Sequence, residues 1–333
     1  MNDIKTLSVV VPLYNERENV LPLLEDVHSA LTDFLPPWEL ILVDDGSSDG
    51  TADEALRHAP DFGSHVQVVT LQRNYGQTAA MQAGVDLARG EYIATMDGDL
   101  QNDPADIPRL VDRIHDEDLD LIVGWRKDRK DNLLARKIPS RIANRLIGRA
   151  TGVQVHDYGC SLKVYRTSVI KRVRLYGEMH RFIPAWMAIE TSPSRIKEEV
   201  VNHRARIHGT SKYGISRVFR VILDLLSVFF FQRFLVRPGH FFGVIGLAMG
   251  TIGILTLSYL VVLKFGLGED IGGRPLFVVG ILFVLMSLQF LMTGILSELM
   301  ARTYFSSPDR KSYSVRKLRN AEQDETEGWQ QPQ

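Results

Sequence analysis

Two long uncharged apolar segments set the strongest limit on how this chain can fold. Residues 241–263 and 275–297 each run for 23 residues without Asp, Glu, Lys or Arg, and the short polar segment 264–274 joins them. A helix of that length reaches about 34 Å, which is enough to cross the hydrocarbon core of a bilayer. A buried core helix is the alternative, but two such segments in succession favour a membrane hairpin.

The charges that flank this hairpin predict its orientation. Lys and Arg gather before the first apolar segment and after the second, whereas the loop between them carries two basic and two acidic residues. Because loops rich in Lys and Arg stay in the cytoplasm, we predict a protein of the cytoplasmic membrane with both termini cytoplasmic. The N-terminus lacks the pattern of a cleaved signal peptide. The single cysteine, Cys160, permits no intrachain disulfide and fits a reducing compartment.

The first two thirds of the chain alternate short apolar runs with helical patterns. Runs typical of buried strands occupy residues 7–13, 39–43, 66–71, 91–96 and 119–123, and helical patterns occupy roughly 16–33, 49–59, 76–89 and 104–116. This alternation predicts an α/β domain with a mainly parallel, Rossmann-like sheet. Polar clusters follow several of the predicted strands, at the edge where open α/β sheets bind ligands.

Two further segments have the character of amphipathic helices. Residues 126–149 hold nine Lys/Arg against two Asp, interleaved with apolar residues, which fits a membrane surface or an anionic substrate; a solvated helix face is the alternative. Residues 215–236 are amphipathic and then apolar, which favours an interfacial helix. The net charge of -1 gives no argument for a nucleic-acid partner.

The strongest chemical motif is Asp97-Gly98-Asp99, which follows a predicted buried strand. Carboxylates at i and i+2 on an extended segment point the same way, so both can approach one hard cation. Mg²⁺ and Mn²⁺ prefer oxygen ligands, and substrate phosphates commonly complete their coordination. We therefore predict a Mg²⁺ or Mn²⁺ site at Asp97 and Asp99. An acidic turn is the plainer alternative for a motif this short.

Other polar clusters also end predicted strands. The segment 42–51 (LVDDGSSDGT) combines adjacent acids with turn and cap residues, and the segment 11–16 (VPLYNE) ends in an aromatic and an acidic side chain. Turn and cap chemistry explains part of the first cluster. Two adjacent acids, Asp44 and Asp45, have a further use as acceptors for a base or ribose. The small residues of the helix that follows Asn74 predict close packing.

Together these motifs resemble a known family. VVVPLYNE, LVDDGSSDGT, RNYGQTAAMQAG and MDGDLQNDP occur in the order and spacing of the family 2 inverting glycosyltransferases with a GT-A fold. DYGCSLKVY, HRFIPAW and RIHGTSKYG extend the likeness to the branch that uses polyprenyl phosphates. That branch includes dolichyl-phosphate mannose synthases and bacterial undecaprenyl-phosphate glucosyl and aminoarabinose transferases. The resemblance covers about residues 6–300.

The resemblance implies roles for residues at matching positions. Asp97 and Asp99 hold the metal, and Asp99 and Asp157 act in catalysis, with Asp157 as a base or as an electrostatic group near the acceptor phosphate. The nucleotide-sugar is bound by Pro12, Tyr14, Glu16, Asp44, Asp45, Asn74, Gln77, Asp97, Gln101 and Arg126. The acceptor and its phosphate are bound by Arg181, Arg206, Ser211 and Lys212.

The chemistry of the acceptor agrees with these roles. A phosphate monoester has a second pKa of about 6, so at neutral pH it is mostly a dianion that barely needs a base. Its requirements are positioning and charge neutralisation, which Arg and Lys supply. We predict transfer of a UDP-linked hexose such as glucose to undecaprenyl or another polyprenyl phosphate. A GDP-mannose donor stays open.

Alternative functions are less consistent with the sequence. A processive polysaccharide synthase needs more membrane spans and a Q-x-x-R-W motif, and an inactive membrane scaffold would not need the acidic pair. A nucleotidylyltransferase would have no use for a membrane hairpin. The predicted division is a catalytic domain at 1–214, an interfacial helix at 215–236, two spans within 237–303 and a basic cytoplasmic tail at 304–333. Small residues such as Gly243, Gly246, Gly250 and Gly253 are consistent with a homo-oligomer.

Overall fold

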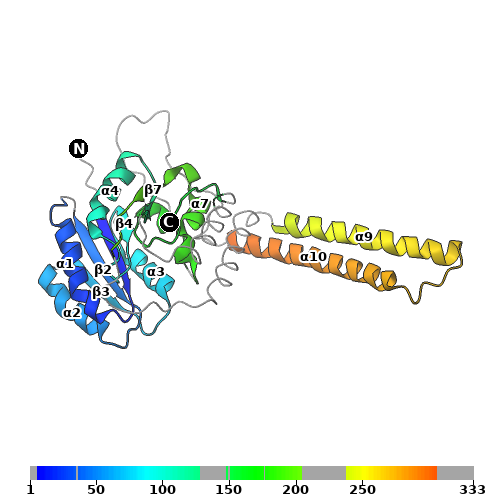
Figure 1. Cartoon of the computed structure of the whole chain (residues 1–333), viewed down its shortest axis with the longest axis horizontal. Coiled ribbons are helices and arrows are strands. Elements are labelled where there is room, and N and C mark those ends of the chain that lie inside the picture. The colour runs from blue at the N-terminus through cyan, green and yellow to red at the C-terminus, as the bar shows by residue number, and fades with distance from the viewer. Residues whose placement is uncertain are drawn as a thin grey trace. The chain divides into compact units, whose positions relative to one another are not determined.

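The computed structural model describes residues 6–34, 37–127, 148, 151–175, 177–204 and 238–305. The chain forms two compact units, Met1–Arg233 and Phe234–Gln333, which are described separately below. Figure 1 shows the sheet and its helices in the first unit and a pair of long helices in the second.

The first unit is built on a seven-stranded sheet with the order β3-β2-β1-β4-β6-β5-β7. Six of these strands run in one direction and β6 runs antiparallel between β4 and β5. Their bounds are Leu7–Leu13 (β1), Trp38–Asp44 (β2), Val66–Thr70 (β3), Tyr92–Thr95 (β4), Leu121–Trp125 (β5), Lys163–Arg166 (β6) and Ile196–Val200 (β7).

Helices cover both faces of this sheet and separate two apolar cores. Alternate residues of β1 point to opposite faces, so Val9 packs with the helices on one side while Val10 packs with those on the other. The first face carries α1 (Val20–Leu31), α2 (Thr51–Phe62) and α4 (Ile107–Asp116); the second carries α3 (Gln77–Leu87), α6 (Thr167–Ile170) and α7 (Ile183–Glu190). Short 3-10 turns occupy Arg17–Asn19 (η1), Pro104–Asp106 (η2), Met179–Phe182 (η3) and Pro193–Arg195 (η4).

Helix α3 lies unusually close to β1. A Cβ at Gly84 would lie 2.2 Å from Cγ1 of Val10 and 3.2 Å from Cγ2 of Val43. Ala80, one turn earlier on the same helix, is fully buried. The small residues of this helix are therefore needed for its close packing on β1 and β2, as the sequence predicts.

The five predicted strands and four predicted helices of this unit are confirmed, with shifts of a few residues at their ends. Strands β6 and β7 were not predicted. The basic segment 126–149 is described only at residues 126, 127 and 148, and the segment 215–236 lies outside the described residues. Their predicted helices, and the domain boundaries at 214 and 236, stay predictions.

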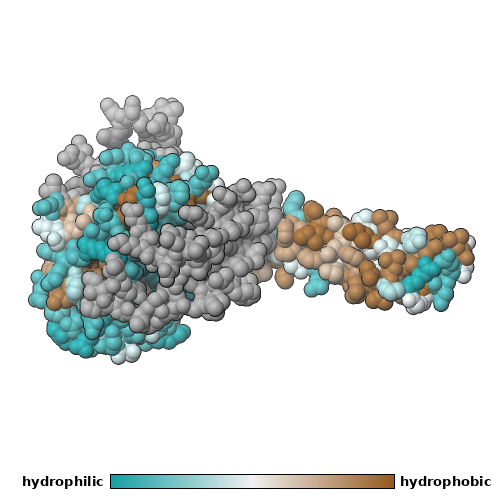
Figure 2. Space-filling view, in the orientation of Figure 1, coloured by the Kyte–Doolittle hydropathy of each residue, from teal (hydrophilic) through white to brown (hydrophobic). Residues whose placement is uncertain are grey.

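The second unit contains the helices α9 (Pro238–Gly266) and α10 (Pro275–Phe305). Helix α9 and the segment Pro275–Met300 are each long and apolar enough to cross a membrane. Within the most apolar 18-residue stretch of each, only 17% and 11% is buried. Figure 2 shows hydrophobic side chains along the visible face of both helices. Such exposure is unlike a core helix, and it is what a bilayer would cover.

The glycines of α9 serve the packing of the hairpin itself. A Cβ at Gly250 would lie 2.6 Å from Oγ of Ser287, and one at Gly253 would lie 2.9 Å from Val284. Gly246 lies equally close to Ser287 and Leu291, whereas Gly243 has open space around it. The close approach predicted for Gly246, Gly250 and Gly253 is thus used between α9 and α10, and the homo-oligomer stays a prediction.

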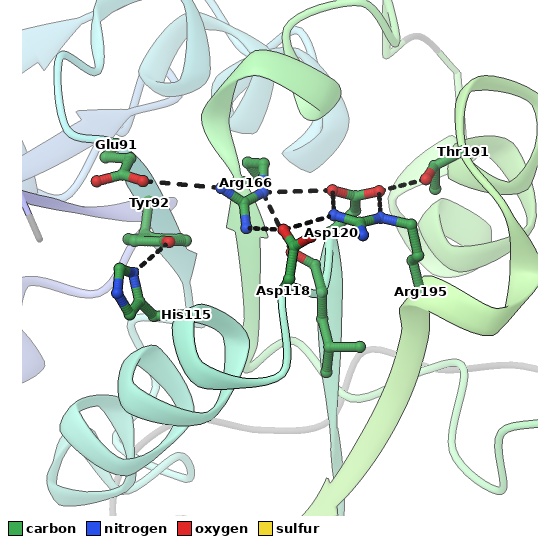
Figure 3. A network of polar contacts seen from close by, with 9 residues as sticks. Glu91, Tyr92, His115, Asp118, Asp120, Arg166, Thr191 and Arg195 are labelled. Carbon is green, nitrogen blue, oxygen red and sulfur yellow. Dashed lines mark hydrogen bonds and ion pairs between the residues drawn. The ribbon is translucent and has the colours of Figure 1, made fainter. Parts of the chain in front are cut away.

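An ion network joins the amino ends of β5 and β7 to the end of β6, as Figure 3 shows. Asp120 precedes β5, and its two carboxylate oxygens accept hydrogen bonds from Arg195 at 2.5 and 2.9 Å. Arg166 lies 3.3 Å from the same carboxylate, and Thr191 also donates to it. Asp118 pairs with both arginines at the solvent-exposed side. Because β6 is antiparallel, this network lies at the edge opposite to the carboxyl ends of the parallel strands.

Asp120 and Asp118 share partners but differ in burial. Burial by itself would raise the pKa of Asp120, but hydrogen bonds from Arg195 and Thr191 and the charges of Arg195 and Arg166 lower it on balance. The side chain of Asp120 is 6% exposed and that of Asp118 is 53% exposed. The buried carboxylate is therefore the one on which the network depends.

We predict that Asp120→Asn lowers the free energy of unfolding by about 3 kcal/mol, because it removes the buried carboxylate that Arg195 and Arg166 share. Asp118→Asn removes an exposed partner of the same arginines and should cost less than about 1 kcal/mol. Denaturant unfolding of the detergent-solubilised full chain measures both. Equal losses in the two variants would contradict this account of the network.

Candidate active site

The strand order brings the predicted motifs to one edge of the sheet. Strand β1 lies between β2 and β4, and the three are parallel, so their carboxyl ends are neighbours. The segments that follow are the Tyr14 loop after β1, the Asp45 loop after β2 and the Asp97 loop after β4. The sequence prediction that these motifs converge is confirmed by the fold.

The loops after β1 and β2 are joined by hydrogen bonds. Asn15 adopts a left-handed conformation with φ of 54°. Its amide donates to Oγ of Ser47 at 2.9 Å, and its side-chain oxygen accepts from the amide of Ser48 at 3.0 Å. The amide of Glu16 donates to Oγ1 of Thr51 at 2.9 Å. Tyr14, the residue before these bonds, is 42% exposed.

Asp45 connects the loop after β2 to the start of α3. It is 2% exposed, and its two carboxylate oxygens accept from the amides of Tyr75 and Gly76, both at 2.8 Å. Asp44 is also buried and accepts from the amide of Ser47 at 3.1 Å. Both acids thus have turn-stabilising roles, and their contact with a nucleotide stays a prediction. Asn74 lies exposed in the loop that Asp45 holds.

The Asp97-Gly98-Asp99 motif occupies the loop after β4. The side-chain amide of Gln77 donates to Oδ1 of Asp97 at 2.7 Å, and Oδ1 of Asp99 accepts from the amide of Gln101 at 3.2 Å. Leu100 has φ of 61°, which turns the chain sharply after the second acid. A Cβ at Gly98 would lie 2.3 Å from Leu13, so this loop packs closely on the end of β1.

The two acids repel one another. Burial raises the pKa of the Asp97 carboxyl, and the charge of Asp99 raises it further, while a hydrogen bond from Ser161 and the charges of Lys163 and Arg126 oppose the rise. Within the described ranges there is no group of three or more His, Cys, Asp or Glu side chains placed to hold a metal. Two hard carboxylate oxygens fit Mg²⁺ or Mn²⁺ whose remaining positions are filled by phosphate or water.

Arg126 and Asp157 form a bidentate ion pair beside this motif. Nε and Nη2 of Arg126, which follows β5, donate to the two oxygens of Asp157 at 2.7 and 3.1 Å. Their side chains are only 12% and 17% exposed. Burial alone would lower the pKa of Arg126, but the hydrogen bond and charge of Asp157 raise it on balance. The structure thus joins two residues to which the sequence analysis gave separate roles.

Of the remaining predicted residues, the structure describes two and leaves three outside its described ranges. Pro12 lies within β1, and Arg181 lies in η3, where it pairs with Glu178 at 2.8 Å. In the same turn, His180 makes a 2.6 Å hydrogen bond with Thr78 at the start of α3. Arg206, Ser211 and Lys212 lie outside the described residues. The segment just before them is tied to the Asp97 loop, since the amide of Arg204 donates to the Gln101 carbonyl at 2.8 Å.

Several residues near the site were missed by the sequence analysis. The side-chain oxygen of Asn102 accepts from Ser161 at 2.7 Å and from the Asp97 amide at 3.4 Å, which links the acidic motif to the segment before β6. Lys163 is fully enclosed near Asp97 and Asp157. The run LKVY carries no signal of this burial, because lysine is almost never fully buried and a short segment that contains it resembles a surface strand.

Comparison with known proteins identifies the family. Residues 8–174, half of the chain, match Glycosyl transferase family 2. The chain belongs to this family. It is 59% identical over 312 residues to the dodecaprenyl-phosphate galacturonate synthase of Rhizobium johnstonii, covering 94% of this chain and 92% of the relative. It is 37% identical to the undecaprenyl-phosphate 4-deoxy-4-formamido-L-arabinose transferase of Serratia proteamaculans, covering 95% and 94%.

Solved structures show the same fold at low sequence identity. Mannosyl-3-phosphoglycerate synthase from Rubrobacter xylanophilus has a TM-score of 0.53 and 15% identity, covering 68% of this chain and 74% of that one. Glucosyl-3-phosphoglycerate synthase from Mycobacterium tuberculosis, solved with Mn²⁺, UDP and glucosyl-3-phosphoglycerate, has a TM-score of 0.51 and 20% identity, covering 68% and 80%. The predicted membership of family 2, the glycosyltransferase class and the GT-A fold are confirmed.

We predict that Asp45→Asn loosens the start of α3, because a side-chain amide group would face a backbone N–H that now donates to a carboxylate. Leaving one buried donor unpaired costs about 1–3 kcal/mol. The melting temperature should fall, and the affinity for nucleotide should fall with it. Asp53→Asn, the same change at an exposed acid in the first turn of α2, is the matched control. Unchanged stability and binding in Asp45→Asn would rule out this role.

Proposed function

We propose that this chain transfers a sugar from a nucleotide-sugar to a polyprenyl phosphate, and that the sugar is galacturonate. The observation that supports this proposal is 59% identity over nearly the whole length of a dodecaprenyl-phosphate galacturonate synthase. The motifs alone favoured a UDP-linked glucose. The relatives direct the proposal from glucose to a uronic acid, while UDP remains the proposed nucleotide.

The geometry of the site is suited to such a transfer. Asp97 and Asp99 would hold a divalent cation against the diphosphate of the donor. When bound, this ion supplies positive charge that stabilises the departing nucleoside diphosphate. Gln77 donates to Asp97 and so keeps that carboxylate directed toward the start of α3. Tyr14 and Glu16 stand on the neighbouring loop, where we assign them to the base and ribose.

The acceptor needs placement more than activation. Its phosphate is already mostly dianionic at neutral pH, so an oxygen of that phosphate can attack the anomeric carbon directly as the bond to the diphosphate breaks. A single displacement of this kind inverts the anomeric configuration. Asp157 is held by Arg126 through both oxygens, which suits an orienting and electrostatic role better than that of a freely moving base. Arg181, Arg206, Ser211 and Lys212 are our candidates for the acceptor phosphate.

The lipid acceptor explains why such an enzyme carries a hairpin of two apolar helices. A polyprenyl phosphate is confined to the bilayer, so α9 and α10 would keep the protein at the surface where its acceptor lies. The basic flanks of the hairpin support a cytoplasmic position for both termini and for the catalytic unit.

The decisive experiment offers purified protein undecaprenyl phosphate and, separately, labelled UDP-galacturonate, UDP-glucose, UDP-glucuronate and GDP-mannose. Each reaction contains Mn²⁺ or Mg²⁺ and is repeated with a chelator. We expect metal-dependent lipid labelling from UDP-galacturonate in preference to the others. Labelling from UDP-glucose or GDP-mannose alone would overturn the sugar assignment, and labelling that survives the chelator would overturn the metal assignment.

We predict that Asp99→Asn reduces turnover by about 10²-fold or more, since metal stabilisation of the leaving group is worth several kcal/mol and each 1.4 kcal/mol is tenfold. Its melting temperature should stay near that of the wild type. Asp103→Asn changes an acid of the same loop that caps η2 and pairs with Arg204, and it should keep near wild-type turnover. Full activity in Asp99→Asn would remove the acidic pair from the mechanism.

A further inference from the structure

Lys163 places a positive charge in the interior of the sheet directly beside the candidate site. It is the first residue of β6 and is only 2% exposed. Its register pairs it with Thr95 in β4 and with Val123 in β5. Those strands lead within a few residues to Asp97 and Arg126. Because β6 is antiparallel, its first residue lies at the carboxyl edge of the parallel strands, where the acidic motif stands.

A buried ammonium group is costly unless it has partners. Nζ of Lys163 donates to the backbone carbonyl of Cys160, and among the residues that the structure describes this is its one hydrogen-bond acceptor. Burial, joined by the charge of Arg126, lowers the pKa of Lys163 on balance, although Cys160, Asp157 and Asp97 raise it in part. The ammonium is thus stabilised by one backbone oxygen and by the acidic groups of the site.

The carbonyl that Lys163 holds belongs to the turn that presents Asp157. The amide of Cys160 donates to the Asp157 carbonyl at 3.5 Å, which closes residues 157–160 into a turn. Cys160 is completely buried, and a Cβ at Gly124 would lie 2.9 Å from its Sγ. One end of the turn is therefore fixed by Lys163 and by packing, and the other by the ion pair of Asp157 with Arg126.

We propose that Lys163 is a positioning residue for the transfer reaction: its hydrogen bond to the Cys160 carbonyl fixes the turn 157–160 and thereby the direction of the Asp157 carboxylate. Together with Arg126, Lys163 also places a second positive charge near the carboxylates of Asp157 and Asp97. Its effect on turnover rests on the proposed function, whereas its effect on the turn does not.

Two substitutions and one control separate the hydrogen bond from the mere filling of space. Lys163→Met keeps most of the volume without a donor, and Lys163→Gln keeps a donor that can reach toward the carbonyl. Lys171→Met is the control, because Nζ of Lys171 also donates to a backbone carbonyl, that of Ala88 at 2.6 Å. Lys171 lies directly after α6 and not at the site. Thermal unfolding shows which variants are folded.

We expect Lys163→Met to lower kcat by about 10²-fold, the loss that a displacement of about 1 Å can cause, with KM for the donor and binding of UDP with Mn²⁺ unchanged. Lys163→Gln should recover part of that loss, and Lys171→Met should behave as the wild type. A wild-type kcat in Lys163→Met, or a rise in donor KM alone, would overturn the proposal.

A double-mutant cycle with Asp157→Asn tests whether Lys163 acts through Asp157. If it does, the double variant should turn over no more slowly than Asp157→Asn alone. The same cycle is run on melting temperatures without substrate, where the two shifts should again be less than additive. Additive effects in the melting cycle would overturn the proposal even if kcat falls.

The melting cycle also separates failure of this proposal from failure of the proposed function. If the wild type labels no lipid from any donor, the proposed function fails. The melting cycle then decides the role of Lys163 by itself: shifts that are less than additive support it, and additive shifts overturn it. If Lys163→Met does not fold, Lys163→Leu, which also lacks a donor, takes its place in both cycles, and additivity there overturns the proposal.

Discussion

The accumulation of negative charge at one edge of the sheet is the constraint on which the rest of the first unit depends. The order of β2, β1 and β4 brings carboxylates from successive loops together. Backbone amides compensate Asp44 and Asp45, and Arg126 compensates Asp157. At the pair Asp97 and Asp99, burial raises the pKa of Asp97 and the charge of Asp99 raises it further, and the charges of Lys163 and Arg126 offset only part of this rise. That imbalance is the property a divalent cation would relieve.

The opposite edge of the same sheet shows what complete compensation achieves. There Asp118 and Asp120 face Arg166 and Arg195, and each oxygen of Asp120 has an arginine donor within 3 Å. The result is a network that joins three strand ends and whose negative charge the arginines already balance (Figure 3). The two edges thus use similar residues for different purposes. At the structural edge an arginine donates directly to both oxygens of the buried carboxylate, whereas at the candidate site Lys163 and Arg126 act on Asp97 through their charges.

The sequence predicted the parts of this unit that depend on local pattern. Strands β1 to β4 are apolar runs followed by polar turns, and their parallel pairing places those turns at one edge of the sheet. Strand β6 was missed because its four residues begin with Lys163 and end with Arg166, so its pattern resembles a surface segment. Its burial comes from β4 and β5, which are distant in sequence. The bond between Arg126 and Asp157 joins residues 31 positions apart and has no local signal.

Charge balance also connects the proposed reaction to the basic segments of the chain. A donor diphosphate, a hexuronate carboxylate and an acceptor phosphate together bring about five negative charges to an edge that already holds Asp97, Asp99 and Asp157. One divalent ion, Arg126 and Lys163 offset only part of this. Eight further Lys/Arg lie within residues 127–149, which follow β5 in the sequence, and further basic residues come after Arg204, beyond β7. A uronic acid donor increases the need for such cations over a neutral hexose, and this makes the basic segments the places where selectivity for the sugar should be sought.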